Sequence, residues 1–305
     1  PDAEPVELSF NDNCTIGIRS GEIYFALRAG HGVKPKLNVD APLCEFDMGP
    51  DQFRLVQKTV LPFVGKPNTG LELVGFDVQC DGETAVFATD KLQLGVAKPD
   101  ISTATPKEPI AVATNPMLWK ITSSLKRESL HVKVSKTASI VSGDGFAFLF
   151  SNMALKMPDF RQILALHSFD IPVKMDKAEF TRVFKAVSMF AYGTGTPVTL
   201  TFEDEMILME GADSVFGTTS VRIAYQSEEA SFLSGKKVAF PPNYLEDIIN
   251  ATSNDEVEIV FRRQEDPGKF ALSPIRIVTS DRGLIIEGPT RLPESQKAKK
   301  DEEED

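Results

Sequence analysis

The sequence has few of the residues on which catalytic and metal-binding proteins usually depend. Its 305 residues include 3 histidines, 3 cysteines and 1 tryptophan, and no apolar run approaches the roughly 18 residues of a membrane span. The cysteines Cys14, Cys44 and Cys80 are too widely spaced for a metal site, so we expect small buried hydrophobic residues in a reducing compartment. The first residues lack the pattern of a secretory signal, which favours a cytoplasmic protein with no membrane partner.

Candidate catalytic residues are also scarce. His31, His131 and His167 are isolated from one another, and a surface or core role is the simpler interpretation of each. The Gly-Thr-Gly-Thr-Pro stretch at 193–197 ends a predicted helix and has no Lys-Ser/Thr after it, which disfavours a phosphate-binding loop. No nucleophile, base and orienting group can be argued to meet, so we expect a protein that is not an enzyme and has no cofactor or metal.

The composition is that of an ordinary globular protein with an acidic balance. Hydrophobic residues make up 42% and charged residues 25%, and the length suggests about two domains. The formal net charge of -11 disfavours a protein that binds nucleic acid over its whole surface. A protein whose basic residues gather on a single face remains compatible with this charge.

Four segments have apolar residues at helical spacing, and they begin about 60 to 65 residues apart. For the second segment, Thr114 is the expected N-cap. For the third, Asp176 and Glu179 have the spacing of a capping box. The predicted helices are 49–65, 114–127, 176–193 and 241–253.

The stretches between these helices alternate β-branched or aromatic residues with polar ones and are punctuated by turns such as Asp81-Gly82. This pattern predicts a unit of one strand, one helix and about three antiparallel strands, used four times. Residues 1–42 supply similar strands without a preceding helix, and the charged tail at 293–305 is expected to be disordered. The fold class is therefore α+β, with helices on one face of antiparallel sheets.

Four short stretches, in order along the chain, resemble motifs of the bacterial DNA polymerase III β subunit family, the sliding clamps. VFATDKLQLGV resembles the family's Ala-Thr-Asp-Gly-(His/Tyr)-Arg-Leu stretch, and MPDFRQIL its Phe-Pro-Asp-(Tyr/Phe) stretch. VAFPPNYLEDIINA is similar to a Phe-Asn-x-x-Tyr-Leu-x-Asp-x-Leu helix, and IIEGPTRL to the closing Met-Pro-Met-Arg-Leu. The resemblance covers roughly residues 5 to 292.

The resemblance implies repeated β-α-βββ units in a DNA-clamp fold, with helices that line a channel and antiparallel sheets outside. Family members have three domains of two units each. In this chain the domains would be 1–42 (the end of domain one), 43–168 (domain two) and 169–292 (domain three). The front of domain one would be missing, which a cut chain or a divergent phage-type clamp would explain.

The implied function is that of a processivity factor. Such a protein encircles duplex DNA without reading its sequence and tethers the replicative polymerase. A homodimeric ring, a clamp loader, and repair polymerases or ligase as further partners are also implied by the resemblance. The protein would lie at the nucleoid, or in the host cytoplasm if it is encoded by a phage.

The DNA channel would be lined by basic residues on the inward faces of the predicted helices. Residues three or four positions apart share a helix face, so these side chains could meet phosphates together. An ordinary solvated helix face is the alternative for each of them. The fourth helix departs from the pattern because Glu246 and Asp247 make it acidic. The expected channel residues are Arg54, Lys58, Lys120, Lys126, Arg127, Arg182 and Lys185.

In the family, partner proteins insert a short apolar peptide between domains two and three. Stiff proline and apolar side chains at a domain junction suit such a site, although Pro158 and Phe160 would also serve simply to pack the seam. The chain departs from the family at Lys91, Leu92 and Gln93, so partner specificity is expected to differ. Carried over by motif, the pocket residues are Leu71, Thr89, Lys91, Leu92, Gln93, Leu94, Pro158, Gln162, Ile163, Leu272, Pro274, Ile286, Gly288, Pro289, Thr290 and Arg291.

Met189 and Phe190, at the end of the third predicted helix, match the positions that contact the neighbouring subunit in the family. Packing in the core is the alternative for both.

A different class of function is a clamp-fold scaffold for protein interactions that never closes on DNA. The basic helix faces favour the encircling clamp, whereas the missing front of domain one and the acidic fourth helix favour the scaffold.

Overall fold

The computed structural model describes residues 6–11, 15–20, 23–28, 40–66, 69–101, 106–124, 129–143, 146–153, 157–192, 195–213, 215 and 217–291. The chain divides into two compact units, 1–39 and 40–305. The first unit contains an antiparallel sheet of β1 (Val6–Asn11), β2 (Thr15–Ser20) and β3 (Ile23–Arg28). Cys14, His31 and the predicted tail at 293–305 lie outside the described residues.

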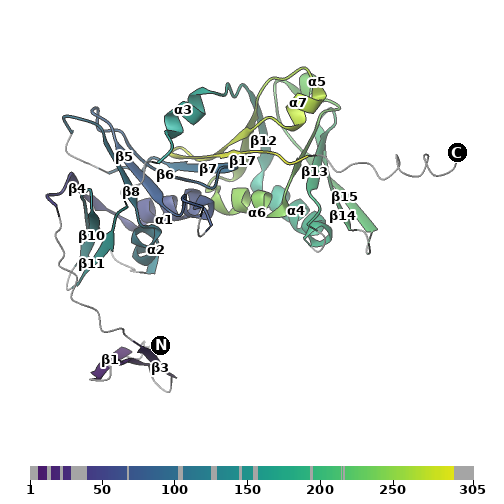
Figure 1. The fold of residues 1–305 in the computed structure, drawn as a ribbon. Coiled ribbons are helices and arrows are strands. Elements are labelled where there is room, and N and C mark those ends of the chain that lie inside the picture. Colours follow the sequence, from purple (N-terminus) through teal and green to yellow (C-terminus); the bar gives the residue numbers. More distant parts are fainter. Residues whose placement is uncertain are drawn as a thin grey trace. The chain divides into compact units, whose positions relative to one another are not determined.

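The second unit contains the predicted strand–helix–three-strand repeat four times (Figure 1). The first repeat is β4 (Cys44–Met48), α1 (Pro50–Thr59), β5 (Val74–Val78), β6 (Thr84–Thr89) and β7 (Gln93–Ala97). The second is β8 (Ile110–Thr114), α2 (Pro116–Ser124), β9 (Leu130–Val134), β10 (Ala138–Gly143) and β11 (Phe146–Ser151). The third is β12 (Ile171–Asp176), α4 (Lys177–Ala191), β13 (Val198–Phe202), β14 (Met206–Asp213) and β15 (Gly217–Ala224). The fourth is β16 (Lys237–Phe240), α6 (Pro242–Ala251), β17 (Glu256–Phe261), β18 (Ile275–Ser280) and β19 (Gly283–Glu287).

Four shorter helices complete the described elements. The 3-10 turn η1 (Leu61–Phe63) extends α1, and α3 (Phe160–Ala165) connects the second repeat to the third. The helix α5 (Ala230–Leu233) precedes the fourth repeat, and α7 (Pro267–Ala271) lies between β17 and β18.

Neighbouring repeats exchange their first strands. β4 pairs with β9 of the second repeat, while β8 pairs with β5 of the first. In the same way β12 pairs with β17, and β16 pairs with β13. The first and second repeats, and likewise the third and fourth, are therefore interlocked by backbone hydrogen bonds, so neither member of a pair can unfold its sheet without disturbing the other.

The two interlocked pairs are joined where β7 meets β19. This antiparallel pairing, in which Gly95 lies opposite Ile285, makes one sheet in the order β12-β17-β18-β19-β7-β6-β5-β8. Four-stranded sheets, β11-β10-β9-β4 and β15-β14-β13-β16, account for the other strands of this unit. We call the β7–β19 junction the seam.

The long helices contact one another in the order α2, α1, α6, α4 (Figure 1). Helix α4 packs mainly on β14 and β15 of a four-stranded sheet, whereas α1 and α6 pack on one face of the eight-stranded sheet. Their inward residues are apolar, for example Phe53 and Val56 of α1 and Phe180 and Val183 of α4. The short helix α3 packs on the opposite face, where Phe160 contacts apolar residues of the sheet. The helices therefore form a row with one apolar face toward the strands and a polar face turned away.

The structure confirms one predicted helix cap and corrects another. The Asp176 side chain accepts a hydrogen bond from the Glu179 N–H at 2.7 Å, as predicted for α4. Thr114 is not the cap of α2, because β8 continues through it and its hydroxyl bonds to Val74 and Trp119. Asn115 takes that role, and its side-chain oxygen accepts a hydrogen bond from the Met117 N–H at 2.9 Å.

The cysteine prediction holds at only one described position. Cys44 is buried, and burial together with the nearby Glu45 raises the pKa of its thiol to about 12. Cys80 is exposed, so the expectation that it is a buried hydrophobic residue is wrong; it follows β5 at the turn before β6, where the chain leaves the core. Among the described helices, none is long and apolar enough to span a membrane.

Candidate functional site

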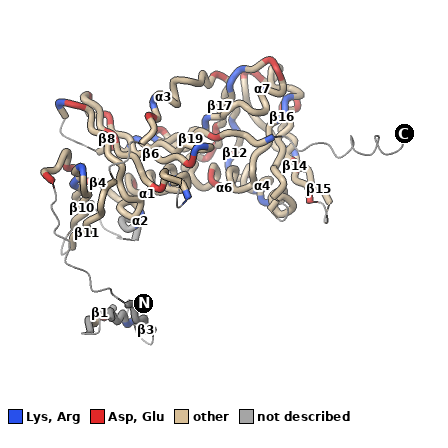
Figure 2. Tube along the Cα trace, in the orientation of Figure 1, with Lys and Arg blue, Asp and Glu red and all other residues tan. Residues whose placement is uncertain are grey.

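The row of long helices exposes basic side chains on its outward face. Arg54 and Lys58 are exposed on α1, and Arg182 and Lys185 are exposed on α4. Arg54 is paired with Asp51 at 2.7 Å, and Arg182 with Glu179 at 3.5 Å. Figure 2 shows acidic and basic positions interspersed along the helices. The face is therefore weakly rather than strongly basic.

Of the other three predicted channel residues, the structure describes one. Lys120 is exposed on α2, in the same row of helices. Lys126 and Arg127 lie outside the described residues. The channel assignment therefore rests on five of the seven residues predicted from the sequence.

The two acidic residues of α6, Glu246 and Asp247, differ in their surroundings. The Tyr192 hydroxyl, from α4, donates a hydrogen bond to Glu246. Burial and then this hydrogen bond raise the pKa of Tyr192, so the phenol stays protonated as a donor. Asp247 is partly buried, and burial followed by repulsion from Glu246 and Asp90 raises its pKa to about 6. Glu246 thus accepts a hydrogen bond that joins α6 to the end of α4, and Asp247 is partly shielded from solvent, so α6 is not simply the acidic surface expected from the sequence.

The predicted peptide-pocket residues on the two strands of the seam lie on both faces of the sheet. Side chains alternate along a strand, so neighbours point in opposite directions. Leu94 and Ile286 face α3 and form one apolar cluster with Phe160 and Ile163. Gln93 lies on the other face, toward the long helices, and its amide contacts Glu287.

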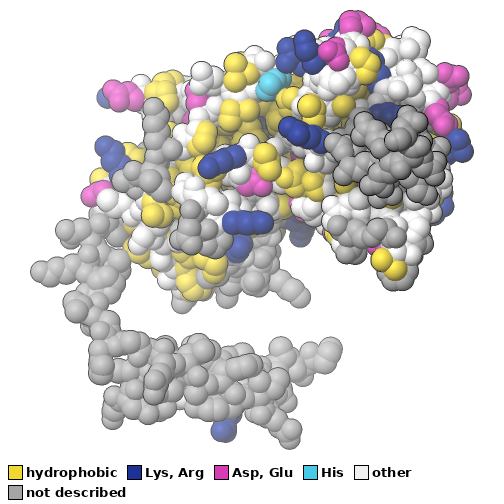
Figure 3. Space-filling model, turned by 45° about the vertical axis from the view of Figure 1, so that its right-hand side comes forward, with side chains coloured by type: hydrophobic (Ala, Val, Ile, Leu, Met, Phe, Trp, Pro, Cys, Tyr) yellow, Lys and Arg dark blue, Asp and Glu magenta, His cyan; other side chains and the backbone are white. Residues whose placement is uncertain are grey.

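Among the other predicted pocket residues, some are joined by backbone hydrogen bonds and some are exposed to solvent. The Gly288 N–H donates to the Leu92 carbonyl at 3.1 Å, which ties the two sides of the seam together. Leu92 and Leu272 are large apolar residues with 65% and 53% of their surface exposed, so both are available to a partner. Figure 3 shows hydrophobic side chains near the middle of one face, with Lys and Arg among them. The other assigned residues are Gln162 on α3, Thr89 at the end of β6, and Leu71, Lys91, Pro158, Pro274, Pro289, Thr290 and Arg291 in segments between the named helices and strands or after β19.

A buried carboxyl group lies beneath the seam. Glu287 is fully buried, and the Gln93 amide donates to its Oε1 at 2.8 Å. Its Oε2 has no hydrogen-bond partner among the described residues. Burial raises the pKa of Glu287 well above its usual range, and repulsion from Asp247 and Asp90 acts in the same direction. The fold therefore favours the neutral form of this side chain.

We expect Glu287→Gln to raise the free energy of unfolding by about 1–2 kcal/mol at pH 8. The raised folded-state pKa stabilises the fold at low pH, and this contribution is lost as the pH rises through that pKa. Glutamine keeps the acceptor for Gln93 and cannot ionise, so the gain should shrink as the pH falls toward about 4.3, the ordinary pKa of glutamate. Urea unfolding at pH 5 and pH 8 measures the difference.

Glu108→Gln is the matched control because that side chain is exposed. It should leave the pH dependence of unfolding unchanged. An equal gain for Glu287→Gln at both pH values would show that ionisation of Glu287 does not limit stability.

Lys91 has a backbone conformation that suits glycine. Its φ is 85°, and it is the non-glycine residue with positive φ in the described part of the chain. The turn is held by Asp90, whose Oδ1 accepts from the N–H groups of Leu92 and Gln93 at 2.9 and 2.8 Å. The sliding-clamp motif has glycine at this position. Lys91 is therefore a strained substitution for that glycine, because a left-handed backbone is unfavourable for a residue with a Cβ.

Lys91→Gly is expected to raise the free energy of unfolding by about 0.5–1 kcal/mol, because the left-handed strain exceeds the added entropy of the unfolded chain. Lys136→Gly, in the β9–β10 turn without positive φ, should lower it by a similar amount. Thermal unfolding of both variants gives the comparison. A lower free energy of unfolding for Lys91→Gly would contradict the inference that the Lys91 backbone is strained.

Met189 and Phe190 end α4 in different environments. Met189 has 74% of its surface exposed, whereas Phe190 is half-buried. The core of this helix is made instead by residues such as Val187 and Ala191. The exposure of Met189 argues against the core interpretation for that residue.

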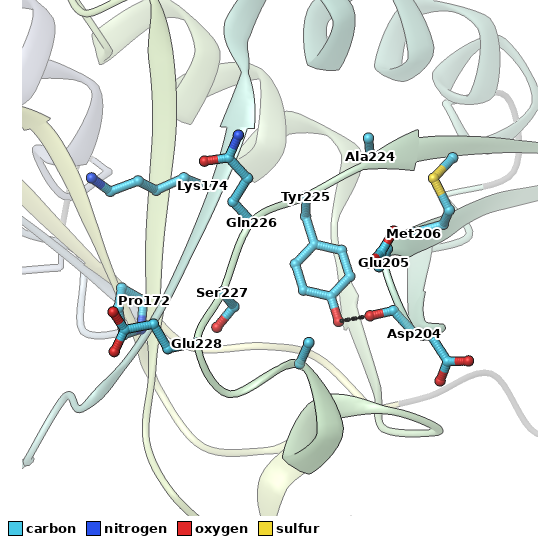
Figure 4. Close-up of a pocket in the computed structure, with 11 residues that line it drawn as sticks. Pro172, Lys174, Asp204, Glu205, Met206, Ala224, Tyr225, Gln226, Ser227 and Glu228 are labelled. Atoms are coloured by element: carbon cyan, nitrogen blue, oxygen red, sulfur yellow. Dashed lines mark hydrogen bonds between the residues drawn. The ribbon is translucent and has the colours of Figure 1, made fainter.

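One hollow was not indicated by any sequence pattern. A cavity of about 770 Å³ lies between β12 and the end of β15, and Figure 4 shows Tyr225 at its centre, between Lys174 and Asp204. The Tyr225 hydroxyl donates to the backbone carbonyls of Glu203 and Asp204 at 3.1 and 3.2 Å. None of the predicted site residues lines the cavity, which lies where an isolated bridge joins Lys174 of β12 to Gln226, just after β15.

Comparisons with known proteins agree with this architecture. Residues 167–273 match the family model for the DNA polymerase III beta subunit, C-terminal domain. The beta subunit of Thermotoga maritima is 17% identical with a TM-score of 0.73, and the alignment covers 94% of this chain and 76% of that chain. The sliding clamp of Bacillus subtilis is 17% identical with a TM-score of 0.74, covering 94% and 75%. This chain has the sliding-clamp fold.

A sliding clamp from Bartonella birtlesii, solved bound to griselimycin, is 19% identical with a TM-score of 0.71, covering 96% of this chain and 78% of that one. A search of curated protein sequences finds no match. The resemblance inferred from four short motifs is confirmed, and so is the α+β clamp architecture. The domain boundaries at 42/43 and 168/169, and the assigned site residues, stay predictions.

Proposed function

We propose that this protein is a sliding clamp that encircles duplex DNA and tethers a replicative polymerase, acting by binding and without turnover. The observation that carries the proposal is the row α2-α1-α6-α4, which turns exposed basic residues away from the sheets. A weakly basic surface built of helices holds the phosphate backbone without reading bases. It also allows sliding, since each exposed ion pair is individually weak.

Ring closure in this proposal uses two copies of the chain and a contact that includes Met189 and Phe190. The exposure of Met189 supports such a contact, because a large apolar side chain on a helix end gains from burial against a partner. A clamp loader that opens the ring belongs to the same proposal, with repair polymerases or a ligase as further partners.

Partner peptides would bind at the seam, over the exposed Leu92 and Leu272 and the apolar cluster of Leu94, Ile163 and Ile286. Lys91 and Arg291 are exposed beside these residues in the chain and would attract acidic groups. The pocket would therefore suit a short apolar peptide that carries a carboxylate.

The clamp-fold scaffold is the second candidate, favoured by the acidic residues of α6. Its support is reduced because Glu246 bonds to Tyr192 and Asp247 is partly buried, so the acidity is not simply a face turned toward DNA. The row of helices thus remains compatible with a phosphate backbone along its length.

Mass photometry and a retention assay on DNA separate the two candidates. A ring of two copies should have about twice the chain mass of 33.5 kDa and, after loading, should stay on circular DNA but leave linearised DNA. A protein that leaves circular and linear DNA equally fast, whatever its mass, would favour the scaffold.

A further inference from the structure

Arg276 is a cation that has no ion pair in the described part of the chain, and it lies on the α3 face of the eight-stranded sheet. It is on β18 between Ile275 and Ile277, whose side chains point into the core beneath the long helices. Side chains alternate along a strand, so Arg276 points to the opposite face. That face is turned away from the helix row, so duplex DNA held by the helices would not reach this side chain.

Strand register places Arg276 beside the proposed peptide pocket. Its neighbours across the sheet are Val260 on β17 and Ile286 on β19, and Ile286 is in turn opposite Leu94 on β7. Residues directly opposite one another have Cβ atoms about 4.5–5.5 Å apart and point to the same face. Ile286 and Leu94 belong to the apolar cluster over which partner peptides would bind. Arg276 is therefore the polar neighbour at the edge of that cluster.

The guanidinium of Arg276 has donors that the described residues leave unused. Its Nε is buried and has no hydrogen-bond partner among them. Its two Nη nitrogens are not buried, and they likewise have no hydrogen-bond or ion-pair partner there. The Phe169 ring centre is 5.5 Å from the guanidinium carbon, a contact that favours one position of the group. A partly desolvated cation with unmet donors gains free energy from a ligand that supplies acceptors.

Other charged groups near β17 do not neutralise Arg276. Glu258, on the same face of that strand, is 3.9 Å from Lys174. Arg262 follows the end of the strand and has no ion pair among the described residues. Burial, and then the charge of Arg262, lower the pKa of His167, which precedes β12. Arg276 and Arg262 are thus two cations without ion pairs in the described part of a chain whose formal net charge is -11.

We propose that Arg276 binds a carboxylate of the partner peptide and thereby determines which peptides the pocket accepts. The inference rests on the peptide-binding part of the proposed function. An apolar residue of the peptide contacts Leu94 and Ile286, while the carboxylate, from an acidic side chain or from the chain end, accepts hydrogen bonds from the Nη nitrogens. Arginine suits this role because its planar fork matches the two oxygens of a carboxylate. Arg276 is not among the pocket residues that the family motifs assign.

Isoleucine methyl NMR of the full chain tests the proposal, with Ile286 as the signal at the site and Ile248 as a core reference. Three peptides are titrated: neutral acetyl-Leu-Leu-Asn amide, acetyl-Leu-Leu-Asp amide with an acidic side chain, and acetyl-Leu-Leu-Asn with a free carboxyl end. At least one acid should bind about 10-fold more tightly than the neutral peptide, as expected for hydrogen bonds to a charged group. The tighter of the two acids identifies the source of the carboxylate.

Substitutions show whether Arg276 provides this preference. Arg276→Gln should bring the acidic and neutral peptides to within about 2-fold of each other, because the charged donor is lost. An unchanged affinity for the neutral peptide shows that the variant is folded. Arg276→Lys keeps the charge without the planar fork and should retain a preference of about 3-fold. Arg282→Gln is the matched control, because Arg282 lies in the turn of the same β18–β19 hairpin and is paired with Asp100; it should keep the full preference.

Three results would overturn the proposal. Equal binding of all three peptides at Ile286 would leave the pocket in place and remove the selection by Arg276. A preference that persists in Arg276→Gln and disappears in Arg291→Gln would assign the carboxylate to Arg291 instead. If no peptide moves the Ile286 signal, the peptide-binding part of the proposed function fails as well, whereas retention on circular DNA tests the clamp separately.

Discussion

Exchanging Arg54, Lys58, Arg182 and Lys185 for glutamate is expected to lower the affinity for duplex DNA by about 100-fold at moderate salt. Each phosphate contact contributes through the counterion that it releases, so its loss also reduces the salt dependence of binding by about 0.9 per contact. The two arginines are partly neutralised by Asp51 and Glu179, so the lysines should account for more of the effect. Fluorescence anisotropy over a salt series measures both quantities.

The control must change the net charge equally without touching the helix row. Four exposed lysines on loops, a strand and a short helix meet this condition, and their exchange for glutamate should change affinity only through weak long-range repulsion. If both sets lowered affinity alike, the long helices would have no special part in binding DNA. The control positions are Lys107, Lys136, Lys237 and Lys269.

The repeat could be predicted from the sequence because its signals are local. Apolar spacing and turn residues depend only on neighbours in the chain, and all four predicted helices occur near their predicted bounds. The exchange of first strands could not be predicted in this way. Pairing of β4 with β9, and of β8 with β5, joins strands that are distant in the chain, and the backbone groups that form these hydrogen bonds give no local signal of their partner.

The candidate site, like the strand exchange, could be predicted only where the signal is local in the chain. The motif match assigned Gln93 and Leu94 to one pocket. Their side chains point to opposite faces of the sheet, because side chains alternate along β7. That separation could have been inferred from their adjacency in a predicted strand. The burial of Glu287 could not, since it depends on β7 and β19 meeting across nearly two hundred residues of chain.

Gly95→Ala is expected to lower the free energy of unfolding by about 3 kcal/mol, the largest stability effect that we predict for a single added methyl group. The added Cβ would lie 2.0 Å from the Thr59 carbonyl oxygen and 2.4 Å from the Phe63 ring. Backbone at the end of α1 would have to move away from β7, since a carbonyl cannot rotate aside as a side-chain tip can. In the third repeat, a Cβ added to Gly211 would lie 2.6 Å from the Val187 carbonyl oxygen, so a close helix–strand approach recurs.

Gly288→Ala is the matched control for this substitution at the same seam. Its added Cβ would meet the Leu92 carbonyl oxygen at 3.5 Å, an ordinary contact, and its φ is not positive. That variant should be neutral or gain about 0.4–1 kcal/mol, because alanine restricts the unfolded chain. Urea unfolding of both variants measures the contrast. If Gly95→Ala were as stable as Gly288→Ala, α1 would not be packed directly on β7, and the helix row would lack its contact with the seam.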